Sequence, residues 1–177
     1  SGTPQQIAAG QFADLSLMLV ENAAPQCRPW PYLPVGLPDE LFTRHVGEKA
    51  VPMTKSEVRA IITSKLRLEE NSRLLEIGAG TGSVTIEAAL AAHSGRVWAL
   101  EKNPAALETC CANIARFGLD NITLLEGAAP EAIPDEVFDR VFIGGSGGNM
   151  AEIVARVLRQ DAPLLIVISA ITLESVS

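Results

Sequence analysis

The sequence has few of the residues that build metal centres and disulfide frameworks. Its 177 residues include two histidines, His45 and His93, and three cysteines, of which Cys110 and Cys111 are adjacent. Two histidines do not indicate a histidine-rich metal site, and three cysteines without a Cys-x-x-Cys pair do not indicate a disulfide framework. We therefore expect no bound metal and a protein of the reducing cytoplasm.

Long apolar runs and an excess of basic charge are also missing. No apolar run approaches the roughly 18 residues of a membrane span, and residues 1–6 lack the basic and apolar regions of a signal peptide. The net charge is −7, whereas a nucleic-acid-binding domain is normally basic. We expect neither a membrane nor a nucleic acid as a partner. A hydrophobic content of 47% fits a globular α/β protein with one good core.

The basic residues are unevenly distributed along the chain. Residues 28–67 hold seven of the 14 lysines and arginines against four acids, so this segment carries +3 and the remainder carries −10. Such a segment is either a solvated helix face or a local attraction for an anionic small molecule.

Strand and helix patterns alternate from residue 72 onward. Strands are predicted at 73–77, 96–101, 122–126, 139–143 and 163–169, and helices near 82–92, 104–117 and 149–159. Asn103 can cap the second of these helices and Asn149 the third. The alternation predicts a mainly parallel sheet with helices on both faces, and a ligand at the carboxyl ends of its strands.

The part before residue 72 has a different pattern. Thr54 and Glu57 form a capping box that opens a helix over Glu57–Leu66, with an apolar face of Val58, Ile61, Ile62 and Leu66. A lone strand at 12–20 precedes a proline-rich stretch typical of a stiff linker. We expect three regions: the tail of a preceding domain at 1–22, a linker at 23–40, and a domain at 41–177 that lacks its final strands.

A glycine motif of the form Glu-x-Gly-x-Gly-x-Gly joins the first of the alternating strands to its helix. Glycine allows the tight turn and lets a ligand approach the backbone. A dinucleotide fingerprint starting at Gly78 would need glycine or alanine at position 83, where Ser83 stands. The acid before the first glycine is instead typical of an S-adenosyl-L-methionine site. The candidate cofactor residues are Glu76, Gly78, Ala79, Gly80, Thr81 and Gly82.

A second acid, Glu101, closes the next strand, 19 residues beyond Gly82. This spacing suits a carboxylate that binds ribose hydroxyls from the end of the second strand. The alternative for the two features together is a glycine turn without a ligand.

Three blocks of the sequence resemble the decarboxylating precorrin methyltransferases of cobalamin biosynthesis. The blocks are Val51–Ala60, Leu74–Leu90 and Phe138–Gly148, and the similarity runs from about Gly36 to the end. The resemblance implies a class I, Rossmann-like methyltransferase that uses S-adenosyl-L-methionine to methylate carbon 15 of a precorrin and decarboxylates the acetate at carbon 12. In the two-domain version of the family, a tetrapyrrole methylase of another fold comes first, which would explain the lone strand.

The resemblance also implies roles for individual residues and partners. Cofactor roles transfer to Thr54, to the loop Gly78–Gly82, to Glu101 and to Ala128. Many related methyltransferases carry Asp or Asn at this last position, so backbone groups of Ala128 would serve the adenine and the affinity would be modest. The expected partners are an anionic tetrapyrrole, the fused methylase domain and further copies of the chain in a homo-oligomer such as a tetramer.

Substrate binding is assigned to two parts of the chain. The segment Gly144–Gly148 follows the fourth strand, where other methyltransferases carry Asn/Asp-Pro-Pro-Tyr to bind an amino nitrogen. Its glycines would let a wide, flat substrate pass, and the alternative is a flexible connection. We assign Gly144, Gly145 and Ser146 to the substrate, with Arg44 and Arg59 pairing with its carboxylates. No catalytic acid or base is identified.

Two other functions stay open. The same fold also serves methyltransferases for tRNA or protein, although acidity and the missing amino-binding motif disfavour tRNA. The domain could also be a non-catalytic cofactor-binding module that supports its fused neighbour.

Overall fold

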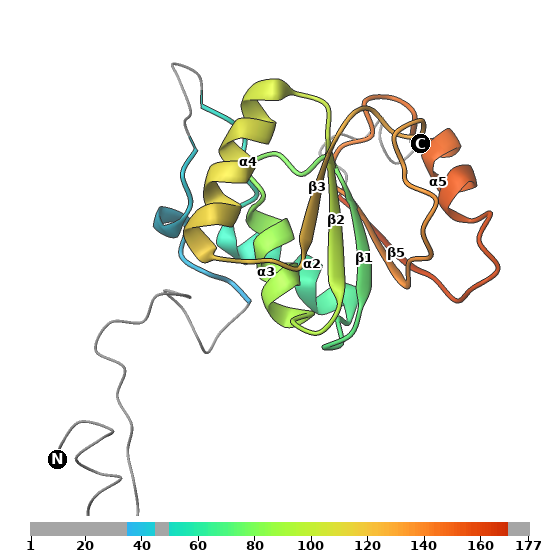
Figure 1. Ribbon diagram of the computed structural model, residues 1–177, viewed down its shortest axis with the longest axis horizontal. Coiled ribbons are helices and arrows are strands. Elements are labelled where there is room, and N and C mark those ends of the chain that lie inside the picture. Colours follow the sequence, from blue (N-terminus) through green and yellow to red (C-terminus); the bar gives the residue numbers. More distant parts are fainter. Residues whose placement is uncertain (1–34, 45–49, 170–177) are drawn as a thin grey trace, which may run out of the picture.

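Five parallel strands form the centre of the computed structural model, which describes residues 35–44 and 50–169 (Figure 1). The strands are β1 Arg73–Ile77, β2 Arg96–Glu101, β3 Ile122–Glu126, β4 Arg140–Ile143 and β5 Leu165–Ile168. Their order across the sheet is β3-β2-β1-β4-β5, so the chain runs outward on one side of β1 and then on the other. The prediction of these five strands in a parallel sheet is confirmed, each to within two residues.

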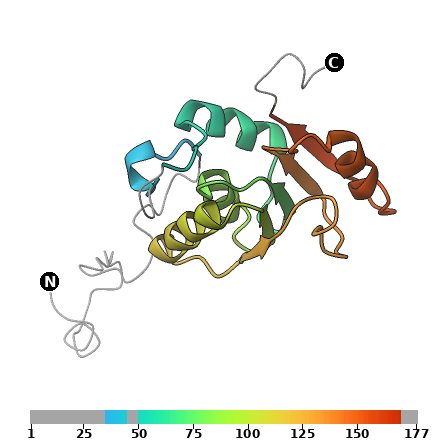
Figure 2. The ribbon, with the colours of Figure 1, turned by 90° about the horizontal axis from the view of Figure 1, so that it is seen from above.

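Helices cover both faces of the sheet, as predicted. The helical elements are a short 3-10 helix, η1, at Asp39–Leu41, followed by α2 Ser56–Leu66, α3 Ser83–Ala91, α4 Pro104–Phe117 and α5 Met150–Val157. Figures 1 and 2 show α2, α3 and α4 on one face and α5 on the other. None of the helices in the part of the chain described by the structure is long and apolar enough to cross a membrane.

The alternation of side chains along β1 divides the core into two layers. Leu75 and Ile77 pack on the α5 side, in a cluster that includes Ile153, while Leu74 packs on the other side, against α2 and α3. Glu76 therefore points toward the α3 side and is buried there, with 1% of its surface exposed. A carboxyl group inside the core is thus a consequence of strand geometry.

The start of α4 confirms the sequence prediction, whereas the starts of α2 and α5 do not. Asn103 accepts N–H bonds from Ala105 and Ala106, as a helix cap should. The predicted capping box at Thr54 is wrong, because the Ser56 N–H at the start of α2 donates instead to Asp39 Oδ1 at 3.0 Å. The side chain of Asn149 makes no cap hydrogen bond at α5 either.

The buried face of α2 also differs from the prediction. Ile62 and Leu66 are buried as expected, but Val58 is 43% and Ile61 60% exposed. The helix is turned so that Arg59 shares the buried face with Ile62 and Leu66. These three residues follow the i, i+3, i+7 spacing of one helix face.

Arg59 is enclosed completely by its partners, with no exposed surface. Its Nε donates to Glu87 Oε1 at 2.7 Å and one terminal nitrogen donates to Asp39 Oδ1 at 2.8 Å. The guanidinium also donates to the carbonyl oxygens of Thr54 and Leu37. The expectation that Arg59 binds a substrate carboxylate is therefore wrong, because this guanidinium is inaccessible and already paired with carboxylates of the protein.

Glu87 extends this network to the segment before α2. Its two carboxylate oxygens accept the N–H groups of Gly36 and Leu37 at 2.9 and 3.0 Å. The last residues of the predicted linker are consequently held against α3. The predicted tail at 1–22 and the earlier part of the linker lie outside the described residues, so the division into domains stays a prediction.

We predict that Arg59→Met lowers the free energy of unfolding by about 3–5 kcal/mol, because it leaves the carboxylate of Glu87 buried without its partner. Lys55→Met is the matched control, since Lys55 pairs with Asp39 at 3.0 Å but is 58% exposed. Its loss should be about 0–1 kcal/mol. Urea titration of both variants measures the difference, and equal losses would contradict a central role for the buried pair.

Candidate functional site

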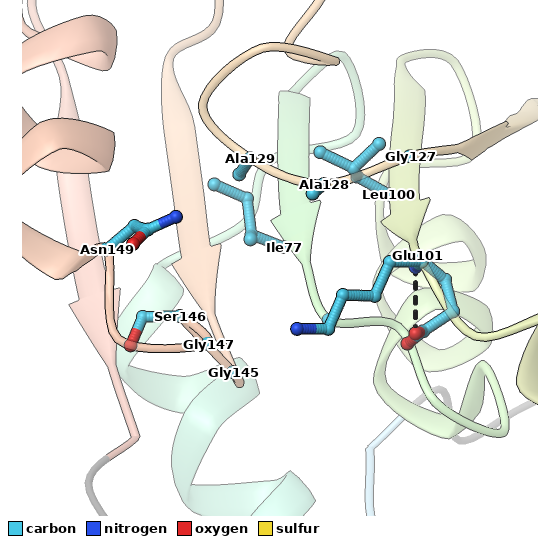
Figure 3. Close-up of a pocket in the computed structure, with 12 residues that line it drawn as sticks. Ile77, Leu100, Glu101, Gly127, Ala128, Ala129, Gly145, Ser146, Gly147 and Asn149 are labelled. Carbon is cyan, nitrogen blue, oxygen red and sulfur yellow. Dashed lines mark hydrogen bonds between the residues drawn. The ribbon is translucent and has the colours of Figure 1, made fainter.

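A cavity of about 250 Å³ opens at the carboxyl ends of β1, β2 and β4, where the strand order reverses (Figure 3). Ile77 of β1 lies opposite Leu100 of β2 and Ile143 of β4, so these strand ends are level. Open α/β sheets bind their ligands at such a point. The lining residues are Ile77, Gly78, Leu100, Glu101, Lys102, Gly127, Ala128, Ala129, Gly145, Ser146, Gly147 and Asn149.

The glycine loop brings the end of β1 against the segment that follows β4. Gly78 has a φ of +83°, and a Cβ built on it would lie 2.9 Å from the backbone nitrogen of Gly145. Any side chain here would therefore collide with the neighbouring backbone. The N–H groups of Gly78 and Ala79 both donate to the Leu100 carbonyl, at 2.9 and 3.1 Å, which fixes the loop to β2.

Glu101 organises the backbone beside the cavity. Its Oε2 accepts the Gly80 N–H at 2.9 Å, and its Oε1 accepts the N–H groups of Lys102 and Asn103, each at 2.9 Å. Two carboxylate oxygens have about four acceptor positions between them, so capacity remains for a ligand hydroxyl. This acid at the rim of a backbone-lined cavity fits the ribose role expected for it.

Glu76 lies beneath the glycine loop rather than in the cavity. The Thr85 hydroxyl of α3 donates to its Oε2 at 2.5 Å. Burial raises the pKa of Glu76 from 4.5 to about 8, and the negative charge of Glu101 acts in the same direction. At neutral pH the carboxyl group behind the loop is therefore mostly protonated and neutral.

The structure separates the predicted cofactor residues into three groups. Gly78, Glu101 and Ala128 line the cavity. Ala79 to Gly82 continue the loop, of which Thr81 is buried with a hydroxyl that lacks a hydrogen-bond partner among the described residues. Glu76 and Thr54 do not line the cavity, and the Thr54 carbonyl is bound to Arg59.

The predicted substrate residues are also only partly brought together. Gly145 and Ser146 line the cavity, and Gly144 lies next to them, with its N–H donated to the Ile77 carbonyl at 2.9 Å. Neither Arg44 nor Arg59 lines it.

Sequence reasoning missed two polar residues of the cavity wall, Lys102 and Asn149. Lys102 directly follows the strand-end acid Glu101, which was the available signal. Asn149 was interpreted as a helix cap, yet Figure 3 shows its amide directed toward the cavity. No group of three or more His, Cys, Asp or Glu side chains that could hold a metal ion occurs in the described ranges.

Comparisons with known proteins agree on one family. The model of the precorrin methyltransferase domain matches residues 46–177. The chain is 41% identical over 155 residues to the probable cobalt-precorrin-6B C(15)-methyltransferase (decarboxylating) of Saccharolobus solfataricus, covering 84% of this chain and 75% of that protein.

Solved structures give the same result. Precorrin-6Y C5,15-methyltransferase from Geobacter metallireducens superposes with a TM-score of 0.74 at 41% identity, covering 82% of this chain and 76% of that one. The C-terminal domain of the enzyme of that name from Rhodobacter capsulatus superposes with a TM-score of 0.69 at 36% identity, covering 80% and 74%.

We predict that Glu76→Gln changes how stability depends on pH. The pKa of Glu76 is raised in the folded state, so between pH 4.5 and about 8 the folded chain keeps a proton that the unfolded chain loses. The contribution of Glu76 to the free energy of unfolding is fully present below pH 4.5. It declines as pH rises through that window, by up to about 1.4 kcal/mol per pH unit. Urea titrations across the window should show that the variant lacks this decline.

Glu126→Gln is the control for this measurement, because Glu126 is an exposed acid at the end of β3. Its stability profile should follow that of the parent. If the parent and Glu76→Gln profiles run parallel over the whole window, the buried carboxyl group does not titrate as described.

Proposed function

This chain belongs to the precorrin methyltransferase family, and on that basis we propose its reaction. It transfers a methyl group from S-adenosyl-L-methionine to carbon 15 of a precorrin and removes the acetate carboxyl at carbon 12 as carbon dioxide. The observation that carries this proposal is the family match over residues 46–177 together with the cavity between the glycine loop and Glu101. Methylation of tRNA or protein is not favoured, because the relatives named above are precorrin enzymes.

The residues around the cavity fit S-adenosyl-L-methionine. Glu101 would accept the ribose hydroxyls, the backbone of Gly78–Gly82 would lie along the amino acid end, and the backbone of Ala128 would contact the adenine. When bound, the cofactor supplies a methyl group activated on a sulfonium. Since Ala128 offers no side-chain acceptor for the adenine amino group, we expect modest affinity.

The chain's own contribution to methyl transfer is the positioning of the two reactants. An in-line displacement gains most from a correct approach of nucleophile and methyl group. Gly145 borders the cavity, and a Cβ built on it would meet nothing within 4 Å, so one side of this segment is open. A flat tetrapyrrole can approach there without meeting a side chain, and Arg44 remains a proposed contact for its carboxylates.

The domain organisation follows the two-domain version of the family. We propose that residues 1–22 are the tail of a fused tetrapyrrole methylase domain, and that residues 23–40 are the linker. The likeness to a C-terminal domain in Rhodobacter capsulatus supports this arrangement. A homo-oligomer and a cytoplasmic location are part of the same proposal.

The function is tested by incubating the full chain with labelled S-adenosyl-L-methionine and a precorrin. Mass analysis of the product should show one methyl group gained and one carboxyl group lost. Label found in tRNA or protein instead would contradict the precorrin reaction. Cofactor binding without any transfer would indicate a non-catalytic module.

We predict that Glu101→Ala weakens binding of S-adenosylhomocysteine, the demethylated cofactor, because it removes charge-assisted hydrogen bonds of about 1.5–3 kcal/mol. This corresponds to a roughly ten- to hundredfold higher Kd in calorimetry. Glu126→Ala is the control, because Glu126 lies beside Glu101 in the strand register but does not line the cavity. Its Kd should match the parent's, and a folded Glu101→Ala variant with unchanged Kd would disprove the ribose role.

We predict that Gly145→Ala impairs binding of the substrate and leaves the stability of the fold unchanged. The φ of Gly145 is not positive and the new methyl group would enter open space, so thermal stability should stay near the parent value. Obstructing the approach of a flat ring system should raise the KM for the precorrin about tenfold. An unchanged KM and kcat would show that the substrate does not pass over this glycine.

A further inference from the structure

We propose that Lys102 binds a carboxylate at this site, through an ammonium group that reaches across the mouth of the cavity. The inference rests on the proposed function and adds a binding residue that the sequence reasoning missed. Lys102 follows Glu101 at the end of β2, and these two are the charged residues among those that line the cavity.

The side chain of Lys102 crosses from one strand end to the neighbouring loop. A Cβ built on Gly147 would lie 2.9 Å from Lys102 Nζ and 4.0 Å from its Cε. Gly147 belongs to the segment between β4 and α5, so the lysine extends from β2 past the end of β1, which lies between β2 and β4. The φ of +61° at Gly147 and the ammonium beside it both favour glycine at this position.

The charge of Lys102 is not neutralised by any carboxylate of the described residues. No oxygen of Asp or Glu in those ranges lies within ion-pair distance of its Nζ, whereas Lys55 and Arg59 are paired with Asp39. The neighbouring Glu101 carboxylate is engaged by three backbone N–H groups. Three ammonium donors thus remain for a ligand.

Two further donors line the cavity from the segment between β4 and α5. Ser146 Oγ accepts the Gly148 N–H at 3.4 Å, which leaves its hydroxyl proton free to donate. Asn149 makes no side-chain cap bond and directs its amide toward the cavity (Figure 3). An ammonium, a hydroxyl and an amide around one space are suited to a carboxylate, whose oxygens accept several hydrogen bonds.

The chemistry of the ligand group is therefore a carboxylate, and the reaction offers two sources of it. One is the methionine end of the cofactor, and the other is an acetate or propionate side chain of the precorrin. A chain of net charge −7 repels the precorrin, which carries several carboxylates, so a free cation at the mouth has particular value for that substrate. Arg59 was expected to have this role, but its guanidinium is buried and pairs with Asp39 and Glu87.

The test compares Lys102→Met, which keeps an unbranched side chain one atom shorter and removes the charge, with Lys102→Arg, which keeps the charge. Lys65→Met is the matched control, because Lys65 is exposed at the end of α2 and does not line the cavity. Calorimetry gives the Kd of S-adenosylhomocysteine and of 5′-methylthioadenosine, which shares the adenosine and sulfur but lacks the carboxylate. Steady-state kinetics give the KM of the precorrin at low and high salt.

Two results support the proposal and distinguish the sources of the carboxylate. An about tenfold weaker Kd for S-adenosylhomocysteine, with unchanged binding of 5′-methylthioadenosine, assigns Lys102 to the cofactor carboxylate. An about tenfold higher, less salt-dependent KM for the precorrin, with unchanged cofactor binding, assigns it to the substrate. In either case Lys102→Arg should regain most of the loss and Lys65→Met should match the parent.

Other results overturn the proposal. If Lys102→Met binds S-adenosylhomocysteine and precorrin as the parent does, Lys102 holds no carboxylate. If the variant loses 5′-methylthioadenosine as strongly as S-adenosylhomocysteine, with the precorrin KM unchanged, the side chain packs on the nucleoside. A parent that binds neither cofactor nor precorrin overturns the proposed function itself, and the inference with it.

Discussion

The arrangement around the site depends on one buried ion pair, between Arg59 of α2 and Glu87 of α3. Helix α3 begins directly after the glycine loop, so whatever positions α3 also positions the loop. The Glu87 carboxylate accepts the backbone N–H groups of Gly36 and Leu37. The Arg59 guanidinium donates to the Thr54 carbonyl, just before the start of α2. Such pairs contribute little net stability compared with apolar packing, but they tolerate only one arrangement of their partners. The pair therefore determines where the elements lie more than how strongly they are held.

Two glutamates of neighbouring strands lie in different environments for geometrical reasons. Glu76 is one residue before the end of β1, and strand alternation turns it into the core on the α3 side. Glu101 is the last residue of β2, where three backbone N–H groups stabilise its carboxylate. A second charge beneath the loop would repel the first, and the raised pKa of Glu76 avoids this at neutral pH. One acid is thus left to act on a ligand and the other is a neutral member of the core.

The sequence predicted what local signals determine and missed what distant partners determine. Short apolar runs marked the five strands, and Asn103 marked the start of α4. Thr54 was predicted to cap α2, but the acceptor at the start of the helix is Asp39. Asp39 lies 17 residues before Ser56, so nothing in the local sequence indicated it. Arg59 looked like a surface cation for the same reason, since Glu87 is 28 residues away. Its i, i+3, i+7 relation to Ile62 and Leu66 was the one local sign that it belongs to the buried face.

Lys102 and Gly147 come from different loops but lie so close together that the residue allowed at one position depends on the residue at the other. A side chain at 147 would occupy the space of the ammonium, and a shorter residue at 102 would release that space. The free-energy effects of substitutions at these two positions should therefore not be additive, as is usual for residues in contact. Over evolutionary time, the glycine can be lost only together with the lysine or with a new path for its side chain. Among related sequences, covariation of these two positions would record the same contact independently of any structure.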